Sequence, residues 1–290
     1  MKIMVAENYL ERIAQLPSIR AEMDRFGIQP TKAFGQNFLL DQNITDKIVR
    51  LSGVSEHDDV IEVGPGPGGL TRSLLKTGAQ ITAIEKDPAL LELLYNLQSI
   101  SANHLNIRNE DALISDMTAL KAEDRPLKIV ANLPYNVATP LLTNWLATAW
   151  PPYFSSMTLM FQKEVADRIV AQPKEKAFGR LAILAQWRCH ANIVMKLPPE
   201  AFTPPPKVNS AVVHFTPKTL DQNAPKVSSV EQVTQAIFHQ RRKKIRAGLK
   251  HIFHDVDSIL QQAGIDPNIR GETLEIEAFL QLAKLLEEQK

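Results

Sequence analysis

The feature that most restricts how this chain of 290 residues can fold is a glycine-rich segment between two apolar stretches. The apolar run Val60–Val63 leads into Gly64-Pro65-Gly66-Pro67-Gly68-Gly69, and an amphipathic stretch follows from Leu70 to Thr77. Glycines allow a tight turn and a close approach of the backbone to a ligand. The free N–H groups at the start of a following helix add hydrogen-bond donors. The segment therefore predicts a ligand-binding turn at the end of a β-strand.

The alternation of strand and helix patterns continues along most of the chain. Strands are expected near residues 60–64, 80–84, 105–108, 127–131 and 156–161. With helical patterns between them, these strands favour an α/β fold with a right-handed, mostly parallel, Rossmann-like sheet. Two later runs, Ile193–Leu197 and Ser210–Phe215, predict a hairpin-like pair at the sheet edge with one antiparallel strand.

The glycine loop alone leaves the class of cofactor open. Gly64, Gly66 and Gly69 satisfy the dinucleotide-binding pattern G-x-G-x-x-G, which would indicate a nicotinamide or flavin enzyme. Glu62, two residues before the first glycine, and the two prolines in the loop instead resemble the first motif of S-adenosylmethionine-dependent methyltransferases. In both interpretations Glu85, at the end of the next strand, accepts the ribose hydroxyls of a bound nucleoside.

A second carboxylate is expected at the same edge of the sheet. Asp111 follows the third predicted strand, and the small side chain of Ala112 leaves room beside it for a ring. Ligands of such sheets bind outside the carboxyl ends of the strands, where Asp111 can accept from an adenine amino group. The alternative is an aspartate that only caps a turn, which is common in loops.

The tetrapeptide Asn132-Leu133-Pro134-Tyr135 follows the predicted strand at residues 127–131. The Asn132 side-chain oxygen and the Leu133 carbonyl can accept both hydrogens of an exocyclic amine, which favours its pyramidal, reactive form. Pro134 fixes its own φ and biases Leu133 away from a helix, and Tyr135 offers a face on which a base can stack. The pattern is typical of methyl transfer to an amine, although an ordinary strand-end turn with a half-buried tyrosine would look the same.

Five motifs that occur in one order make the pattern specific. They are Phe34-Gly35-Gln36-Asn37-Phe38-Leu39, Glu62-Val63-Gly64-Pro65-Gly66, Asn132-Leu133-Pro134-Tyr135, Leu159-Met160-Phe161-Gln162-Lys163-Glu164 and Phe202-Thr203-Pro204-Pro205-Pro206-Lys207-Val208. In this combination the chain resembles the KsgA-type small-subunit (16S) rRNA adenine N6,N6-dimethyltransferases, most closely from Lys32 to Pro217.

The resemblance implies a cofactor, a substrate and a set of site residues. S-adenosyl-L-methionine would donate methyl groups to N6 of two adjacent adenines near the 3′ end of the rRNA, in an immature ribosomal small subunit. The implied cofactor-binding residues are Asn37, Leu39, Gly64, Glu85, Asp111 and Asn132. The implied catalytic residues are Asn132, Leu133, Pro134, Tyr135 and Phe202. Among these, Tyr135 and Phe202 would hold the flipped-out target base, with the prolines beside Phe202 as a brace.

Three alternatives remain open at this point. A large-subunit rRNA or DNA adenine-N6 methyltransferase would share the catalytic motifs and differ in its C-terminal domain, although the related DNA enzymes usually carry proline at the position of Leu133. A nicotinamide dehydrogenase would leave the tetrapeptide unexplained. A ribosome-assembly or transcription factor with vestigial chemistry would keep the fold and lose the site, whereas the site motifs here look intact.

The length of the chain predicts one large and one small domain, because a single core rarely grows to this size. We expect a methyltransferase domain over residues 32–218, a polar linker over 219–226 and a small all-helical domain over 227–290. Residues 1–31 form an N-terminal extension beyond the usual start of the family, and the sequence assigns no role to it.

Basic residues cluster in the predicted helical domain, although the formal net charge is only +1. Such a run without acids favours phosphate contacts over a solvated helix face. The predicted RNA-binding residues, on one helix with Lys250, are Arg241, Arg242, Lys243, Lys244 and Arg246. A second group, interrupted by acids, is the alternative surface and comprises Lys163, Arg168, Lys174, Lys176 and Arg180.

The remaining composition fits a cytoplasmic protein without a metal. The single cysteine, Cys189, excludes an intramolecular disulfide and suits a reducing compartment. No cysteine or acid stands at ligand spacing beside His251 and His254, so we expect no metal site. No apolar run approaches the roughly 20 residues that span a bilayer. We therefore expect a monomer that acts in the cytoplasm and away from membranes.

Overall fold

The computed structural model describes residues 9–31, 34–122 and 125–289. Its main sheet has seven strands in the order β4-β3-β2-β5-β6-β9-β7. In that order the strands are Leu105–Asn109, Gln80–Glu85, Asp59–Val63, Leu127–Ala131, Ser156–Gln162, Ser210–Pro217 and Cys189–Leu197. The five strands predicted to alternate with helices are all present, and they pair in parallel from β4 to β6. The predicted fold class is confirmed.

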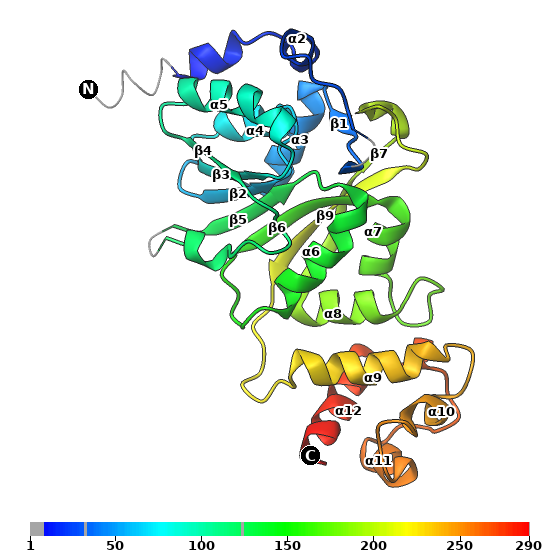
Figure 1. Cartoon of the computed structure of the whole chain (residues 1–290). Helices are drawn as coiled ribbons and strands as arrows, with labels where there is room; N and C mark the ends of the chain where they lie inside the picture. The colour runs from blue at the N-terminus through cyan, green and yellow to red at the C-terminus, as the bar shows by residue number, and fades with distance from the viewer. Residues whose placement is uncertain (1–8, 32–33, 123–124, 290) are drawn as a thin grey trace. The chain divides into compact units, whose positions relative to one another are not determined.

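Helices cover both faces of this sheet (Figure 1). Helices α3 (Gln42–Ser52), α4 (Gly69–Leu75) and α5 (Leu91–Ile100) lie over one face, and α6 (Tyr135–Ala147) lies over the other. The chain leaves β2 toward β3 and β4, then returns to the other side of β2 at β5. Because parallel crossovers are right-handed, connections that run in opposite directions place their helices on opposite faces. The strand order therefore reverses between β2 and β5, where ligands of such sheets bind.

The predicted pair of late strands is present at one edge of the sheet. β9 runs antiparallel to β6, with Gln162 opposite Ser210, and β7 is the outermost strand. The loop between β7 and β9 adds a separate two-stranded sheet, in which β1 (Phe38–Leu39) pairs antiparallel with β8 (Phe202–Thr203). The motif around Phe38 and the proline-rich motif around Phe202 thus lie side by side, although about 160 residues separate them.

The remaining elements are helices that precede, connect or follow the strands. The α-helices are α2 (Ile19–Arg25), α7 (Lys163–Val170), α8 (Arg180–Arg188), α9 (Val227–His239), α10 (Ile245–Leu249), α11 (Val256–Gln262) and α12 (Ile276–Glu288). The 3₁₀ helices are η2 (Pro88–Leu90), η3 (Thr118–Leu120), η4 (Pro199–Ala201) and η5 (Gly271–Thr273). Of the helices that the structure describes, none is both long and apolar enough to cross a bilayer.

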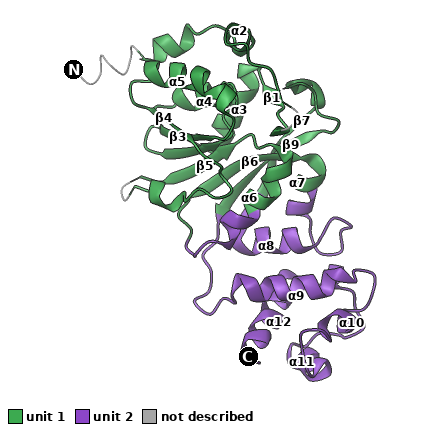
Figure 2. Cartoon of the chain, viewed as in Figure 1, with its two compact units in different colours: residues 1–142, 152–166, 192–216 green, residues 143–151, 167–191, 217–290 purple. Residues whose placement is uncertain are grey.

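The chain divides into two compact units (Figure 2). Unit 1 comprises residues 1–142, 152–166 and 192–216, and unit 2 comprises residues 143–151, 167–191 and 217–290. Unit 2 has its own aromatic core, in which the rings of Phe238 and Phe279 stack at 5.8 Å and each lies 6.4 Å from that of Phe178. These packing units do not test the domain boundaries predicted from the sequence, which remain a prediction.

The prediction that one continuous helix carries the basic run is wrong, because the chain turns between α9 and α10. Helix α9 ends at His239, and residues 240–244 form the turn. Gly248 of α10 packs directly on α9, where a Cβ at Gly248 would clash with the Ala236 carbonyl. This close crossing requires a turn rather than one continuous helix. The basic side chains from Arg241 to Lys244 therefore project from a loop, and Arg246 lies on α10.

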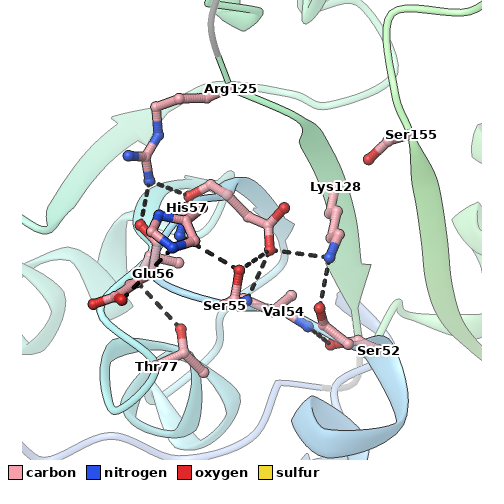
Figure 3. A network of polar contacts seen from close by, with 12 residues as sticks. Ser52, Val54, Ser55, Glu56, His57, Thr77, Arg125, Lys128 and Ser155 are labelled. Carbon is pink, nitrogen blue, oxygen red and sulfur yellow. Dashed lines mark hydrogen bonds and ion pairs between the residues drawn. The ribbon is translucent and has the colours of Figure 1, made fainter.

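A polar network lies at the end of the sheet where β2 and β5 begin (Figure 3). The Asp58 carboxylate accepts hydrogen bonds from the backbone N–H and the hydroxyl of Ser55, at 2.8 and 2.9 Å, and from Lys128 at 2.9 Å. Arg125 pairs with Asp59 at 2.6 Å and donates to the carbonyls of Glu56 and Asp58. Burial raises the pKa of Asp58, but the bonds from Lys128 and Ser55 outweigh it, so that pKa lies below its usual value.

Lys128→Met should destabilise the protein by about 3–5 kcal/mol at neutral pH, because it leaves the buried Asp58 carboxylate without its cation. The contribution of Asp58 is present above its unfolded pKa of about 3.9 and is lost as the pH falls through its lower folded pKa. The difference in unfolding free energy between the variant and the wild type should therefore become smaller in acid. Urea unfolding at several pH values measures it. Lys76→Met, in the exposed pair with Asp46, should cost less than about 1 kcal/mol, and equal deficits would contradict this account.

Candidate active site

A cavity opens at the carboxyl ends of β2, β3, β4 and β5, beside the point where the strand order reverses. It is lined mainly by five segments that are far apart in the sequence. They are the loop at 34–39, the glycine loop at 62–70, the strand ends at 84–86 and 110–113, and the segment at 132–137. The parallel sheet therefore brings the glycine loop, two acidic strand ends and the tetrapeptide to one place.

Two positions of the glycine loop require glycine for the loop to line the cavity. Gly64 and Gly66 have φ of +68° and +57°, in the left-handed region that side chains rarely adopt. A Cβ on Gly66 would stand 3.0 Å from the Phe38 ring, closer than side-chain atoms normally approach. The N–H of Gly66 donates to Glu85 Oε2 at 3.2 Å. The loop thus presents bare backbone to the cavity and is tied to the next strand.

Glu85 is a buried carboxylate held by backbone donors. Its Oε1 accepts from the N–H of Asp87 at 2.8 Å and its Oε2 accepts from Gly66. Burial raises the pKa of Glu85 above its usual range and the charge of Asp87 adds to that, while the hydrogen bonds from Asp87 and Gly66 partly oppose it. Each oxygen keeps acceptor capacity for a further donor, such as a hydroxyl of a ligand.

Asp111 stands at the end of β4 with both oxygens engaged. Its Oδ2 accepts from Lys86 at 2.7 Å and its Oδ1 accepts from the N–H of Leu113 at 3.0 Å. The hydrogen bond from Lys86, followed by that from Leu113, lowers the pKa of Asp111. A carboxylate oxygen accepts more than one hydrogen bond, so Asp111 can still receive an amino group. Asp111 therefore caps a turn and also lines the cavity, and its contact with an adenine amino group stays a prediction.

The tetrapeptide lies across the cavity from these acids. The Asn132 side-chain nitrogen donates to the carbonyl of Asn37 at 3.4 Å, which leaves the amide oxygen as an acceptor. The Pro134 carbonyl accepts from Val137 and Ala138 at the start of α6, and so the Leu133 carbonyl stands ahead of the helical ladder. The Tyr135 hydroxyl bonds the hydroxyl of buried Ser210 at 2.6 Å, which fixes its ring. This local geometry is compatible with two acceptors and a stacking face, whose roles stay a prediction.

The structure gathers most of the predicted site residues at the cavity and leaves one out. Those that line it are Asn37, Leu39, Gly64, Glu85, Asp111, Asn132, Leu133, Pro134 and Tyr135. Phe202 does not line the cavity. It is buried on β8 opposite Leu39 of β1. Its observed contact is with the strand that carries part of the cavity wall, and its predicted contact with a base stays a prediction.

Sequence reasoning overlooked several residues that line the cavity. Gln36, Phe38 and Lys86 stand directly beside predicted site residues, and Gln36 and Phe38 belong to the quoted motif at 34–39. Their positions in the sequence could have marked them as neighbours of the cavity. Their individual contacts depend on chain segments that only the fold brings together.

Glu62 is the least expected group in the cavity wall. The residue is 1 % exposed, and neither carboxylate oxygen has a hydrogen-bond partner within the described residues. Burial raises the pKa of Glu62 to about 8, the Thr71 hydroxyl opposes this, and the charge of Glu85 adds to it. The carboxyl is therefore mostly protonated at neutral pH and would ionise beside a positively charged ligand.

The predicted RNA-binding residues divide into paired and unpaired cations. Arg241 donates to Glu272 at 3.0 Å and to the Lys176 carbonyl at 2.5 Å. Lys244 donates to Asn268 at 2.6 Å, and Arg246 pairs with Asp257. Three exposed cations form no side-chain hydrogen bond or ion pair within the described residues, namely Arg242, Lys243 and Lys250. The bond from Arg241 to Lys176 also joins the two basic groups, which the sequence treated as alternatives.

Among the described residues, no three histidine, cysteine, aspartate or glutamate side chains gather as metal ligands. The groups at the cavity are instead carboxylates, amides, backbone N–H groups and an aromatic face. Together with a Rossmann-like sheet, this set offers acceptors that could receive hydrogen bonds from a nucleoside and from an amine.

Comparison with known proteins makes the assignment specific. The family model described as "Ribosomal RNA adenine dimethylase" matches residues 28–288. A "Ribosomal RNA small subunit methyltransferase A" from Cereibacter sphaeroides is 51% identical over 270 residues, covering 93% of this chain and 96% of that protein. The protein of the same description from Jannaschia sp. is 52% identical over 276 residues, covering 94% of this chain and 94% of that protein. The chain belongs to the ribosomal RNA adenine dimethylase family.

Solved structures agree with this fold. A dimethyladenosine transferase from Plasmodium falciparum is similar with a TM-score of 0.69 at 24% identity, covering 86% of this chain and 96% of that one. The 23S rRNA methyltransferase ErmE is similar with a TM-score of 0.63 at 25% identity, covering 87% of this chain and all of that one. The first comparison supports the fold alone.

Glu62→Gln should change how stability depends on pH. The folded pKa of about 8 exceeds the unfolded value, so the contribution of Glu62 to stability is greatest in mild acid and is lost as the pH rises toward 8. The amide does not titrate, so the melting temperature of the variant should fall less than that of the wild type between about pH 5 and about pH 8. Thermal unfolding without ligand measures this. Glu56→Gln, at an exposed site, is the control and should follow the wild type.

Proposed function

We propose that this protein uses S-adenosyl-L-methionine to dimethylate N6 of two adjacent adenines near the 3′ end of small-subunit rRNA. The observation that carries the proposal is the juxtaposition of Asn132 and Leu133 with Glu85 and Asp111 around one cavity. One end of this cavity offers acceptors for a nucleoside, and the other offers two acceptors for an amine. We further propose that the substrate is an immature small subunit, that the protein acts as a cytoplasmic monomer, and that no metal takes part.

The cavity fits S-adenosyl-L-methionine on three grounds. Gly66 leaves a space that a Cβ would fill, so backbone can approach a ligand there. Glu85 and Asp111 supply acceptors for ribose hydroxyls and for an adenine amino group. Glu62 is a buried carboxyl without a partner, which a cation would stabilise in its ionised form. Asn37, Leu39, Gly64 and Asn132 would complete the contacts with the cofactor.

When bound, the cofactor supplies a methyl group on a positively charged sulfonium. The residues of this chain position the amine that accepts the methyl group. The Asn132 amide oxygen and the Leu133 carbonyl accept the two hydrogens of adenine N6, so its lone pair is less delocalised into the ring. Tyr135, fixed by Ser210, stacks on the flipped-out base. A strong general base is not required, since a methylated ring amine loses its proton readily to water.

The alternatives from the sequence are less well supported. Membership in the rRNA adenine dimethylase family leaves a nicotinamide dehydrogenase without support. ErmE shares the fold at 25% identity, whereas relatives described as small-subunit methyltransferases reach 50% and more. This difference favours the small-subunit rRNA over the large-subunit rRNA. Leu133 stands where the DNA enzymes usually carry proline, which favours RNA over DNA.

We propose that unit 2 contacts rRNA phosphates through its unpaired cations. Arg242 and Lys243 lie in the exposed turn between α9 and α10, and neither forms an ion pair with a described residue. Arg241 is held by Glu272 and Lys176, so it fastens this turn rather than offering a free charge. The turn therefore presents two cations on a fixed backbone, which suits contact with phosphate.

Asn132→Ala should lower the rate of methyl transfer by about two to three powers of ten, because it removes one preorganised acceptor. The protein should stay folded and should still bind RNA, since Asn132 makes a single long hydrogen bond within the protein. Transfer of labelled methyl groups to small subunits measures the rate. Asn106→Ala, at an exposed position on β4, is the control. A normal rate in the Asn132 variant would contradict the proposed role of the tetrapeptide.

Arg242→Ala with Lys243→Ala should weaken binding to the small subunit and make its salt dependence shallower. Each lost phosphate contact lowers the slope of log affinity against log salt by about 0.7–0.9. Filter binding at several salt concentrations measures the slope. Lys47→Ala with Arg50→Ala removes the same charge from exposed positions on α3 and should leave the slope unchanged. Equal slopes for both double variants would show that the turn does not contact phosphate.

A further inference from the structure

The N-terminal segment, to which the sequence assigns no role, packs against the rest of unit 1 over its described residues 9–31. We call these residues the N-terminal arm. Residues 9–14 are helical, α2 follows, and Ser18 caps α2 by accepting from the N–H of Ala21. Buried side chains of the arm join the hydrophobic core that contains the inner residues of α4 and α5. They are Tyr9, Ile13, Ile19, Met23 and Ile28.

The arm is attached first to α4, the helix that follows the glycine loop. The Tyr9 hydroxyl donates to the Leu75 carbonyl at 3.1 Å. Arg72 donates to the Pro17 carbonyl at 2.6 Å and lies 4.0 Å from the Glu22 carboxylate. Arg72 and Glu22 are both buried, and a buried pair with incomplete hydrogen bonding serves better to fix an arrangement than to add stability. The arm therefore holds the back of the helix whose first residue, Gly69, lines the cavity.

The second attachment leads directly into the cavity. The N–H of Thr31, at the end of the arm, donates to Gln36 Oε1 at 2.8 Å. Gln36 Nε2 donates to Asp87 Oδ2 at 2.7 Å. The N–H of Asp87 in turn donates to Glu85 Oε1 at 2.8 Å. A continuous chain of hydrogen bonds thus joins the arm to the carboxylate that would bind ribose.

Gln36 is the residue that connects the arm to Asp87 in this series of hydrogen bonds. Its amide has one acceptor and one donor group, and the bond from Thr31 fixes which of them faces Asp87. Asp87 also caps η2 through Ala89, at 3.0 Å, so its side chain is held from two sides. With Asp87 held, its backbone N–H stays directed at Glu85. The arrangement preorganises Glu85 before a ligand enters.

We propose that the N-terminal arm is part of the cofactor site and that Gln36 is the positioning residue through which it acts on Glu85. The inference rests on the proposed function, because it assumes that Glu85 binds the cofactor. Loss of the chain of hydrogen bonds should weaken cofactor binding and leave methyl transfer at saturating cofactor unchanged. Replacing a residue needed only for folding would not weaken cofactor binding while leaving the transfer rate at saturating cofactor unchanged.

The test compares Gln36→Leu with Gln80→Leu. Both variants lose an amide of the same size, and Gln80 bonds His104 at the opposite end of β3. Gln36→Leu should weaken binding of S-adenosyl-L-methionine, measured by calorimetry, by about three- to tenfold, the effect of losing one or two net hydrogen bonds. Its KM for the cofactor should rise by a similar factor, with kcat and rRNA affinity as in the wild type. Gln80→Leu should match the wild type throughout.

Thr31→Pro tests the arm without altering the cavity wall. Proline removes the N–H that bonds Gln36, at an exposed position. Binding should weaken less than in Gln36→Leu, and the double variant should bind no more weakly than Gln36→Leu alone, because both changes break one chain. Fully additive effects would overturn the proposed link from the arm to Gln36.

The remaining outcomes separate this inference from the proposed function. Cofactor binding by the wild type with an unchanged affinity in Gln36→Leu would overturn the inference alone. A fall in kcat with unchanged cofactor affinity would also overturn it and would place Gln36 at the target base. Absence of cofactor binding by the wild type would overturn both the proposed function and this inference.

Discussion

The parallel pairing of β2 with both β3 and β5 is the constraint on which the site depends. Val63 at the end of β2 stands opposite Ile84, and the N–H of Gly64 continues the ladder to the Ile84 carbonyl at 2.9 Å. The glycine loop therefore starts at the level where β3 reaches Glu85. A shift of one residue would turn alternate side chains to the other face of the sheet. This register aligns acceptors from three strand ends, although the chain between them is long.

Buried carboxylates are paired at the end of the sheet where the strands begin and unpaired at the end where the strands finish. Where the strands begin, Asp58 is enclosed by Lys128 and Ser55, and its carboxylate is satisfied. Where the strands end, Glu62 is buried without a partner, and burial raises the pKa of Glu85. Unpaired buried carboxyls cost stability, so the cavity edge holds groups that a purely structural core would exclude. The paired edge and the large apolar core offset this cost and leave the cavity carboxyls available to a ligand.

The basic surface shows why a run of charges is an incomplete description of a binding site. In the sequence, Arg241, Arg242 and Lys243 are equivalent members of one cluster. In the fold, Arg241 is occupied by Glu272 and Lys176, and it holds the turn that presents the other two. Cations already paired with an acid contribute less to phosphate binding, since their field is partly neutralised. The structure thus separates the residue that shapes this surface from those that offer free charge.

The sequence by itself determined the five strands that alternate with helices, the glycine turn at Gly64 and Gly66, and the position of Asn132 after a strand end, because each depends on local periodicity or backbone preference. Tertiary structure alone decided the break after His239, since close packing at Gly248 overrides helical periodicity. It also buried Phe202 against Leu39 and linked the arm to Glu85 through Gln36. These features are contacts between particular side chains of segments far apart in the chain, and local patterns do not specify such individual contacts.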